Sequence, residues 1–97
     1  MPADRLGVLA VGEAGAWLVT HPRLDVALNG TGDVITALLS AETLAGSSIA
    51  DGLARAVSRM FALVEATKAV GARELQLIQA QERWLAPTAT FDPVRVA

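Results

Sequence analysis

The sequence has no cysteine, a single histidine and few aromatic residues, two tryptophans and two phenylalanines. Without cysteine the chain can form no disulfide framework, no thiolate metal site and no cysteine nucleophile, and it suits a reducing compartment. The one histidine, His21, precedes Pro22 in an apparent turn. We therefore interpret His21 as a solvated loop residue rather than as a member of a Ser-His-Asp triad.

An excess of basic residues is also absent, because 8 Lys and Arg residues stand against 10 Asp and Glu residues and the net charge is −2. Neither nucleic acid nor a membrane surface is therefore expected as a partner. No stretch reaches the roughly 18 consecutive apolar residues of a membrane-spanning helix, and the opening MPADRLG lacks the basic and apolar regions of a secretion signal. The expected location is the cytoplasm.

Aliphatic residues dominate what is present: 53% of the 97 residues are hydrophobic and 19% are charged. This composition is typical of a packed globular chain with an aliphatic, alanine-rich core. The length allows at most one domain, and it is small for an enzyme.

Two short apolar runs, GVLAV (7–11) and AWLVT (16–20), flank the turn-prone GEAG segment. This pattern predicts an antiparallel hairpin. Neither run alternates cleanly between apolar and polar residues, so both faces of the hairpin are expected to be buried. A third run, DVAL (25–28), is a possible third strand.

Helical spacing of apolar residues predicts three helices after the strands. The first spans about 32–45 and ends at Gly46, and the second begins at Ser47 or Ser48 and ends near Gly71. A third, shorter helical segment is expected within RELQLIQAQERWLAP (73–87), with Leu75, Ile78 and Leu85 facing inward. The predicted class is α/β, with the strands early and the helices late.

This arrangement is physically incomplete. Short strands with two apolar faces need helices on both sides and further strands at their edges. A chain of 97 residues supplies neither in full. The sequence therefore resembles one end of a larger α/β sheet, a single partial domain over residues 1–97.

The NGTGDV segment (29–34) joins the predicted strands to the first predicted helix. Gly30 and Gly32 can adopt backbone angles that let successive N–H groups converge, and the helix start adds the positive end of its dipole. Such a junction can bind phosphate oxygens, and Asp33 beside it could accept a proton from a substrate hydroxyl. A lone Gly-x-Gly junction is weak evidence, so the spacing alone favours a plain turn followed by a first-turn acid.

NGTGDVITALL is similar to the Gly-(Ala/Thr)-Gly-Asp signature of ribokinase-like sugar and vitamin kinases. Together with DRLGVLAVGEAGAWLVTHPRL before it and EATKAVGARELQLIQAQERWLAP near the end, the chain resembles the C-terminal part of bacterial pyridoxal kinases over essentially all its residues. Related pyrimidine kinases tend to carry cysteine at the position of Asp33. The aspartate therefore favours the pyridoxal branch.

The resemblance implies a function for the junction. Asp33 would be the catalytic base that takes the proton from the 5′-hydroxymethyl group of pyridoxal, and Gly30, Thr31 and Gly32 would supply the amides of an anion hole. Leu28 would line the substrate or nucleotide pocket. ATP with Mg²⁺ would be the phosphoryl donor, with the metal ligands outside this chain, and the complete kinase would be a homodimer.

Because pyridoxal kinases are much longer, the resemblance also implies that the isolated chain has little or no kinase activity. Two alternatives stay open. The chain could be a non-catalytic remnant that acts as a binding or assembly module, or an independent small α+β domain in which the glycine motif is merely a turn.

Overall fold

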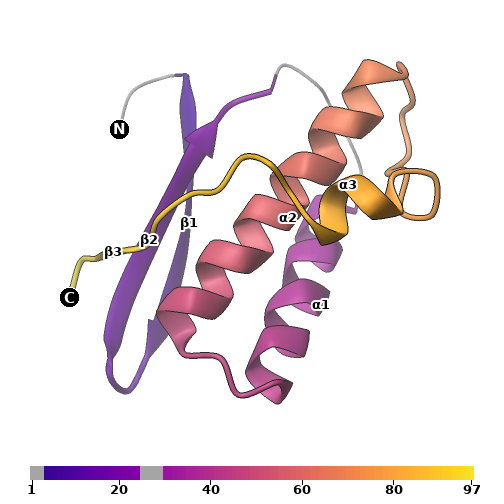
Figure 1. The fold of residues 1–97 in the computed structure, drawn as a ribbon. Coiled ribbons are helices and arrows are strands. Elements are labelled where there is room, and N and C mark those ends of the chain that lie inside the picture. Colours follow the sequence, from indigo (N-terminus) through magenta and orange to yellow (C-terminus); the bar gives the residue numbers. More distant parts are fainter. Residues whose placement is uncertain (1–3, 25–29) are drawn as a thin grey trace.

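The computed structural model describes residues 4–24 and 30–97, which form a small antiparallel sheet and three helices (Figure 1). Strands that follow one another in the sequence are neighbours in this sheet. The elements, in chain order, are β1 (Arg5–Gly12), β2 (Gly15–Pro22), α1 (Thr31–Leu44), α2 (Ile49–Ala69), α3 (Gln81–Leu85) and β3 (Val94–Arg95).

The predicted hairpin is confirmed, and its strands are longer than the apolar runs suggested. Gly12 pairs with Gly15, which leaves Glu13 and Ala14 as a two-residue turn. Gly15 has φ +139, and a Cβ there would lie 2.6 Å from the carbonyl oxygen of Ala97. Glycine is therefore required where the hairpin turns beneath the end of the chain.

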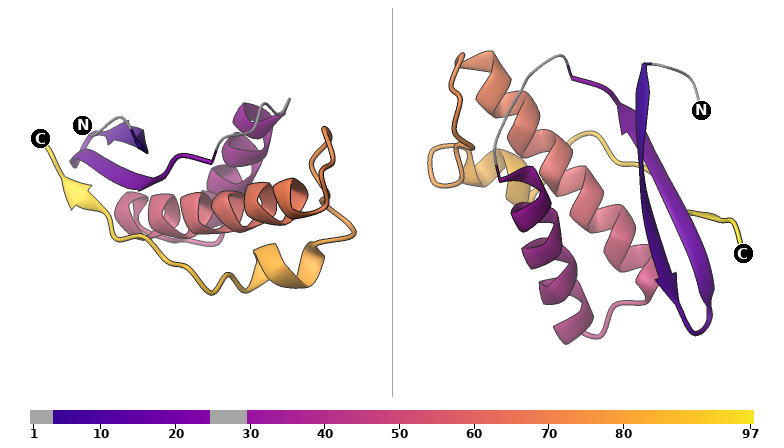
Figure 2. Two further views of the ribbon diagram at one scale, coloured as in Figure 1. Left: turned by 90° about the horizontal axis from the view of Figure 1, so that it is seen from above. Right: turned by 180° about the vertical axis from the view of Figure 1, so that it is seen from behind.

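Helix α2 is the centre of the fold. It lies between the sheet and α3, and α1 runs beside it (Figure 2). Val19 of β2 and Leu53 and Val57 of α2 are completely buried and form the main core. A second cluster, centred on Leu63, packs the far half of α2 against the segment that leads into α3.

The helix boundaries follow their local signals. Ser48 is the N-cap of α2, and its Oγ accepts a hydrogen bond from the N–H of Asp51 at 3.1 Å. Gly46 and Gly71, which follow α1 and α2, have φ of +88 and +68. These left-handed conformations are typical of helix ends, as the sequence predicted. None of the described helices is long and apolar enough to cross a membrane.

The third predicted helix is confirmed within 73–87, but only Gln81–Leu85 is helical. Leu75 packs against the Leu63 cluster as expected, whereas the prediction that Ile78 and Leu85 face inward is wrong, because they are 81% and 45% exposed. Two hydrogen bonds hold the segment before Gln81 in a non-helical conformation. The Oγ1 of Thr67 accepts a hydrogen bond from the N–H of Gln76, and the Nε1 of Trp84 donates one to the carbonyl of Leu77. The possible strand at 25–28 lies outside the described residues.

The prediction that both faces of the hairpin are buried is also wrong for this chain. Helix α2 covers one face, whereas Leu9 and Val11 on the other are 57% and 75% exposed. The last residues add a strand that the sequence did not predict, because Val94 and Arg95 pair with Leu18 and Trp17 of β2.

Candidate active site

The predicted site residues lie at the start of α1. Gly30 is the N-cap with φ +91, and Thr31, Gly32 and Asp33 form the first helical turn. The N–H of Val34 donates to the carbonyl of Gly30 at 3.0 Å, which closes this turn. Within the described ranges no side chain caps the helix, so the first-turn N–H groups point outward at the positive end of the helix dipole.

The two glycines of the junction differ in what they do. The φ of Gly30 lies in the left-handed region, which disfavours any other residue. A Cβ on Gly32 would have no heavy atom within 4 Å, and this glycine has no positive φ. Neither packing against the described residues nor backbone conformation therefore requires glycine at position 32.

Asp33 is exposed in the first turn of α1. It lines a hollow of about 300 Å³ whose other walls are apolar and come from α1, α3 and the segment before α3, including Val34, Leu77 and Trp84. Its carboxylate is therefore free to meet a ligand from outside the chain. A carboxylate so placed can accept a proton from a hydroxyl group.

A second hollow, of about 340 Å³, lies beside the same turn. Thr31 and Gly32 line it together with Leu6, Gly7 and Val8 of β1 and with residues of α2. The structure thus brings Gly30, Thr31, Gly32 and Asp33 together in one turn, but Asp33 borders one hollow and Thr31 and Gly32 border the other. Leu28, the remaining predicted site residue, lies outside the described residues.

His21 was misread from the sequence as a solvated loop residue. It belongs to β2, is only 7% exposed and lines the hollow that Thr31 and Gly32 border. Its ring packs against those of Phe61 and Phe91, with centroids 5.8 and 6.3 Å away. The strand tolerates Pro22 because it is the final residue of β2 and pairs with Arg5, where no N–H from Pro22 is needed.

Sequence reasoning also missed a buried carboxylate on α1. Glu42 is 8% exposed and accepts hydrogen bonds from the Oγ of Ser47 at 2.6 Å and the Nε of Arg55 at 3.1 Å. Arg59 lies 3.5 Å from its other oxygen. The hydrogen bond from Ser47 and the two arginines hold the pKa of Glu42 below its usual value, although burial opposes this. The network fastens α1 to α2.

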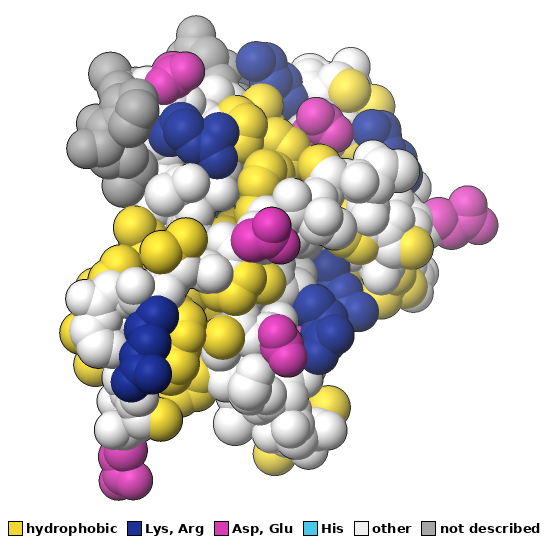
Figure 3. Space-filling view, turned by 60° about the vertical axis from the view of Figure 1, so that its left-hand side comes forward, with side chains coloured by type: hydrophobic (Ala, Val, Ile, Leu, Met, Phe, Trp, Pro, Cys, Tyr) yellow, Lys and Arg dark blue, Asp and Glu magenta, His cyan; other side chains and the backbone are white. Residues whose placement is uncertain are grey.

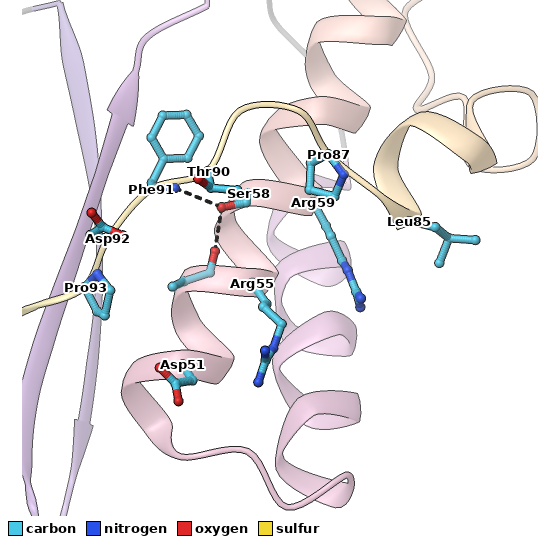
Figure 4. A pocket seen from close by; sticks show the side chains of 11 residues that line it. Asp51, Arg55, Ser58, Arg59, Leu85, Pro87, Thr90, Phe91, Asp92 and Pro93 are labelled. Atoms are coloured by element: carbon cyan, nitrogen blue, oxygen red, sulfur yellow. Dashed lines mark hydrogen bonds between the residues drawn. The ribbon is translucent and has the colours of Figure 1, made fainter.

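Arg55 and Arg59 also border a third hollow, of about 340 Å³, between α2 and the segment 85–93 (Figure 4). The Oγ of Ser58 donates to the carbonyl of Ala54 and accepts the N–H of Phe91, which ties the segment to the helix. Since both arginines pair with Glu42 and the rim carries Asp51 and Asp92, this hollow has no net positive charge to hold an anion.

No group of three or more His, Asp or Glu side chains that could hold a metal ion occurs among residues 4–24 and 30–97. The arrangement at the start of α1 instead offers main-chain donors and one carboxylate. Such a set can hold a phosphoryl group and remove a proton from a hydroxyl beside it.

Comparison with known proteins shows what the chain is similar to. No protein-family model matches the chain. The chain is 40% identical over 96 residues to the pyridoxal kinase PdxY of Corynebacterium diphtheriae, a match that covers 99% of the chain and 34% of the relative. The chain therefore spans about a third of the length of this curated relative.

Solved structures share the fold. The pyridoxal kinase of Entamoeba histolytica matches 99% of the chain and 35% of its own length with a TM-score of 0.81 and 18% identity. The pyridoxal kinase of Leishmania donovani in complex with ADP matches 96% of the chain and 33% of its own length with a TM-score of 0.75 and 21% identity. The fold is thus that of the C-terminal part of an α/β, ribokinase-like fold, as the sequence predicted. In sequence and fold together, the chain corresponds to the C-terminal part of pyridoxal kinases.

Proposed function

We propose that the chain supplies the phosphoryl-transfer corner of a pyridoxal kinase, which uses ATP to phosphorylate the 5′-hydroxymethyl group of pyridoxal. One observation carries the proposal: α1 starts at a left-handed glycine with its first-turn amides uncapped by any described side chain and an exposed Asp33 among them. The names of the relatives support the substrate, and the ADP complex of the Leishmania donovani kinase supports the nucleotide.

In the proposed reaction Asp33 accepts the proton of the 5′-hydroxyl group. The hydroxyl oxygen then forms a bond to the γ-phosphorus of ATP, the bond between that phosphorus and the β,γ-bridging oxygen breaks, and ADP leaves with the bond's electron pair. The N–H groups of Gly30, Thr31 and Gly32 hold the transferred phosphoryl group as its charge is redistributed. Products are pyridoxal 5′-phosphate and ADP.

Residues 4–24 and 30–97 fit part of this task. Open backbone at Gly32 suits close approach of phosphate oxygens, and the exposed carboxylate suits proton removal. Mg²⁺, which neutralises phosphate charge in such reactions, would take its ligands from the part of the kinase that has no counterpart in this chain. In this proposal residues 1–97 are a single partial domain, and Leu28 borders the substrate or nucleotide.

Because positioning of nucleotide, metal and acceptor supplies most of the rate in phosphoryl transfer, one corner of the site is not enough. We expect little or no pyridoxal phosphorylation by the isolated chain. We further propose that the complete kinase is a homodimer that works in the cytoplasm, which light scattering and cell fractionation would test.

A chimeric kinase tests the function directly. Residues 4–97 would replace the matching C-terminal third of the Corynebacterium diphtheriae relative, and ATP-dependent formation of pyridoxal 5′-phosphate would be measured. Turnover within about tenfold of the parent kinase is expected. A chimera that folds and binds ATP but forms no product would favour the second candidate, a non-catalytic assembly module. The exposed apolar outer face of the sheet supports this second candidate.

A further inference from the structure

The hollow that Thr31 and Gly32 border differs from the exposed apolar surface of the chain. Hydrophobic side chains gather on the face shown in Figure 3, where charged side chains divide them into patches. Such a surface can bury a partner, but it offers few polar groups that could select one ligand over another. In the hollow, His21 adds a polar ring to walls that are otherwise mostly apolar and, among the described residues, uncharged. Those apolar walls are Leu6, Val8, Ile35, Met60 and Val64.

The ring of His21 is held in one orientation. Its Nδ1 lies 2.9 Å from the carbonyl oxygen of Pro22. Its faces and edges pack against Phe61 and Phe91, whose own rings meet edge-on with centroids 5.1 Å apart. The N–H of Phe91 in turn donates to the Oγ of Ser58 at 3.2 Å, which ties this aromatic group to α2. A ring held in this way presents its free nitrogen at a fixed place.

The hydrogen bond to Pro22 decides the role of each ring nitrogen of His21. A carbonyl oxygen only accepts, so Nδ1 carries the proton of the neutral ring and Nε2 is left as an acceptor. Within residues 4–24 and 30–97 Nε2 has no hydrogen-bond partner, and no buried side-chain nitrogen or oxygen there lacks one. Nε2 therefore reaches accessible space, and the hollow that the ring lines is such a space.

The in-line geometry of phosphoryl transfer indicates which ligand meets this acceptor. Asp33, the proposed base, borders the hollow between α1 and α3, so the hydroxyl group of pyridoxal approaches from that side. The leaving ADP departs from the opposite side of the phosphoryl group, where Thr31 and Gly32 border the hollow of His21. With a volume of about 340 Å³ and mostly apolar walls, this hollow suits a heterocyclic base.

We propose that His21 determines the base specificity of the phosphoryl donor, because its Nε2 accepts a hydrogen bond from an amino group at C6 of a purine. The inference rests on the proposed function and adds a residue that selects the nucleotide. A 6-oxo purine would set its carbonyl oxygen against Nε2 with no proton between the two acceptors. Covering a ring nitrogen without giving it a partner is unfavourable, so the site should select adenine over a 6-oxo base.

Three phosphoryl donors test this role in the chimeric kinase. ATP has an amino group at C6, inosine triphosphate has a carbonyl there, and purine riboside triphosphate has only hydrogen. His21→Leu should lower kcat/KM for ATP on the order of 10-fold and change kcat/KM for purine riboside triphosphate by less than about twofold. His21→Gln should keep most of the activity with ATP and gain activity with inosine triphosphate, because its amide can turn either its oxygen or its N–H₂ toward the base.

Thr67→Val is the matched control for lost stability. It removes a hydrogen bond between α2 and Gln76, and Thr67 does not line the hollow. The ratios of kcat/KM among the three donors should stay as in the unsubstituted chimera. If His21→Leu lowers kcat/KM for all three donors alike, His21 is a packing residue and the proposal is overturned.

The ring of His21 can also be observed in the 97-residue chain itself, because it is the only histidine. Nitrogen-15 NMR at a pH where the ring is neutral should show a protonated Nδ1 and an unprotonated Nε2. A ring protonated at Nε2 would overturn the proposal, since that nitrogen could then accept no hydrogen bond. This measurement needs neither a variant nor kinase activity.

Titration calorimetry of the chimera separates this inference from the proposed function. A chimera that binds ATP more tightly than inosine triphosphate, and loses the difference in His21→Leu, supports the role of His21 even if no pyridoxal is phosphorylated. That result without turnover would contradict the proposed function alone. Phosphorylation of pyridoxal with donor ratios that His21→Leu leaves unchanged would contradict the role of His21 alone.

Discussion

Alanine substitutions can distinguish a structural role of Gly30 from a functional role of Gly32. The two variants are Gly30→Ala and Gly32→Ala. At Gly30 the φ of +91 lies in a region that costs other residues about 1–2 kcal/mol. For a chain of this length that cost corresponds to a fall in the melting temperature of roughly 5–15 °C. Gly32 has ordinary φ and open space around its Cα. Alanine there should stabilise the helix by about 0.5–1 kcal/mol.

Urea unfolding followed by tryptophan fluorescence measures both effects, since Trp17 packs against the main core and Trp84 against the second cluster. In the chimeric kinase Gly32→Ala should lower kcat on the order of 100-fold, because the methyl group holds the phosphoryl group away from the amides. Destabilisation by Gly32→Ala with unchanged kcat would refute the reasoning, and so would unchanged stability in Gly30→Ala.

Two further substitutions test the polar contacts that hold the helices. Glu42→Gln should destabilise the chain by about 1–3 kcal/mol at neutral pH, with exposed Glu65→Gln as the control. Since the pKa of Glu42 is lowered by folding, the stability it contributes is present above about pH 4.5 and is lost as the pH falls through the lowered pKa. The difference between wild type and variant should therefore shrink in acid, and a constant difference would contradict the assignment. Thr67→Val should cost about 1–3 kcal/mol because it leaves the N–H of Gln76 without its acceptor. The Oγ1 of Thr67 also donates to the carbonyl of Leu63, and Thr43→Val removes the equivalent bond to the carbonyl of Leu39 at an exposed site. Thr43→Val should change stability by less than about 0.5 kcal/mol, and equal losses for the two variants in calorimetry would contradict this explanation.

Local signals in the sequence predicted the elements with strong punctuation. Gly12 and Gly15 indicated the turn of the hairpin. Ser48 and Gly71 indicated the two ends of helix α2, and each lies within two residues of the end that the structure shows. The third helix is shorter than the apolar spacing suggested, because the side-chain hydrogen bonds of Thr67 and Trp84, which join residues 9 and 7 positions apart, hold the segment before it in a non-helical path. Periodicity carries no information about such contacts.

The residues of the candidate site could be predicted from the sequence, whereas the buried residues around it could not. Glycine, glycine and aspartate at 30, 32 and 33 are adjacent in sequence, so their common turn follows from local structure. His21 was misread because its burial depends on Phe61 and Phe91, which are 40 and 70 residues away. Glu42 was not singled out from the sequence, because its partners Arg55 and Arg59 are brought to it only by the fold.

The central claim is that Asp33 is the base of a phosphoryl-transfer site. Asp33→Asn in the chimeric kinase tests it most directly, with Asp51→Asn as the control, because Asp51 is likewise an exposed first-turn aspartate, in α2. Both changes remove the same helix-dipole interaction of about 0.3–1 kcal/mol. We predict that Asp33→Asn lowers kcat for pyridoxal by at least about 100-fold with ATP binding retained, and that Asp51→Asn leaves kcat unchanged. Equal kcat values for the two variants would contradict the account.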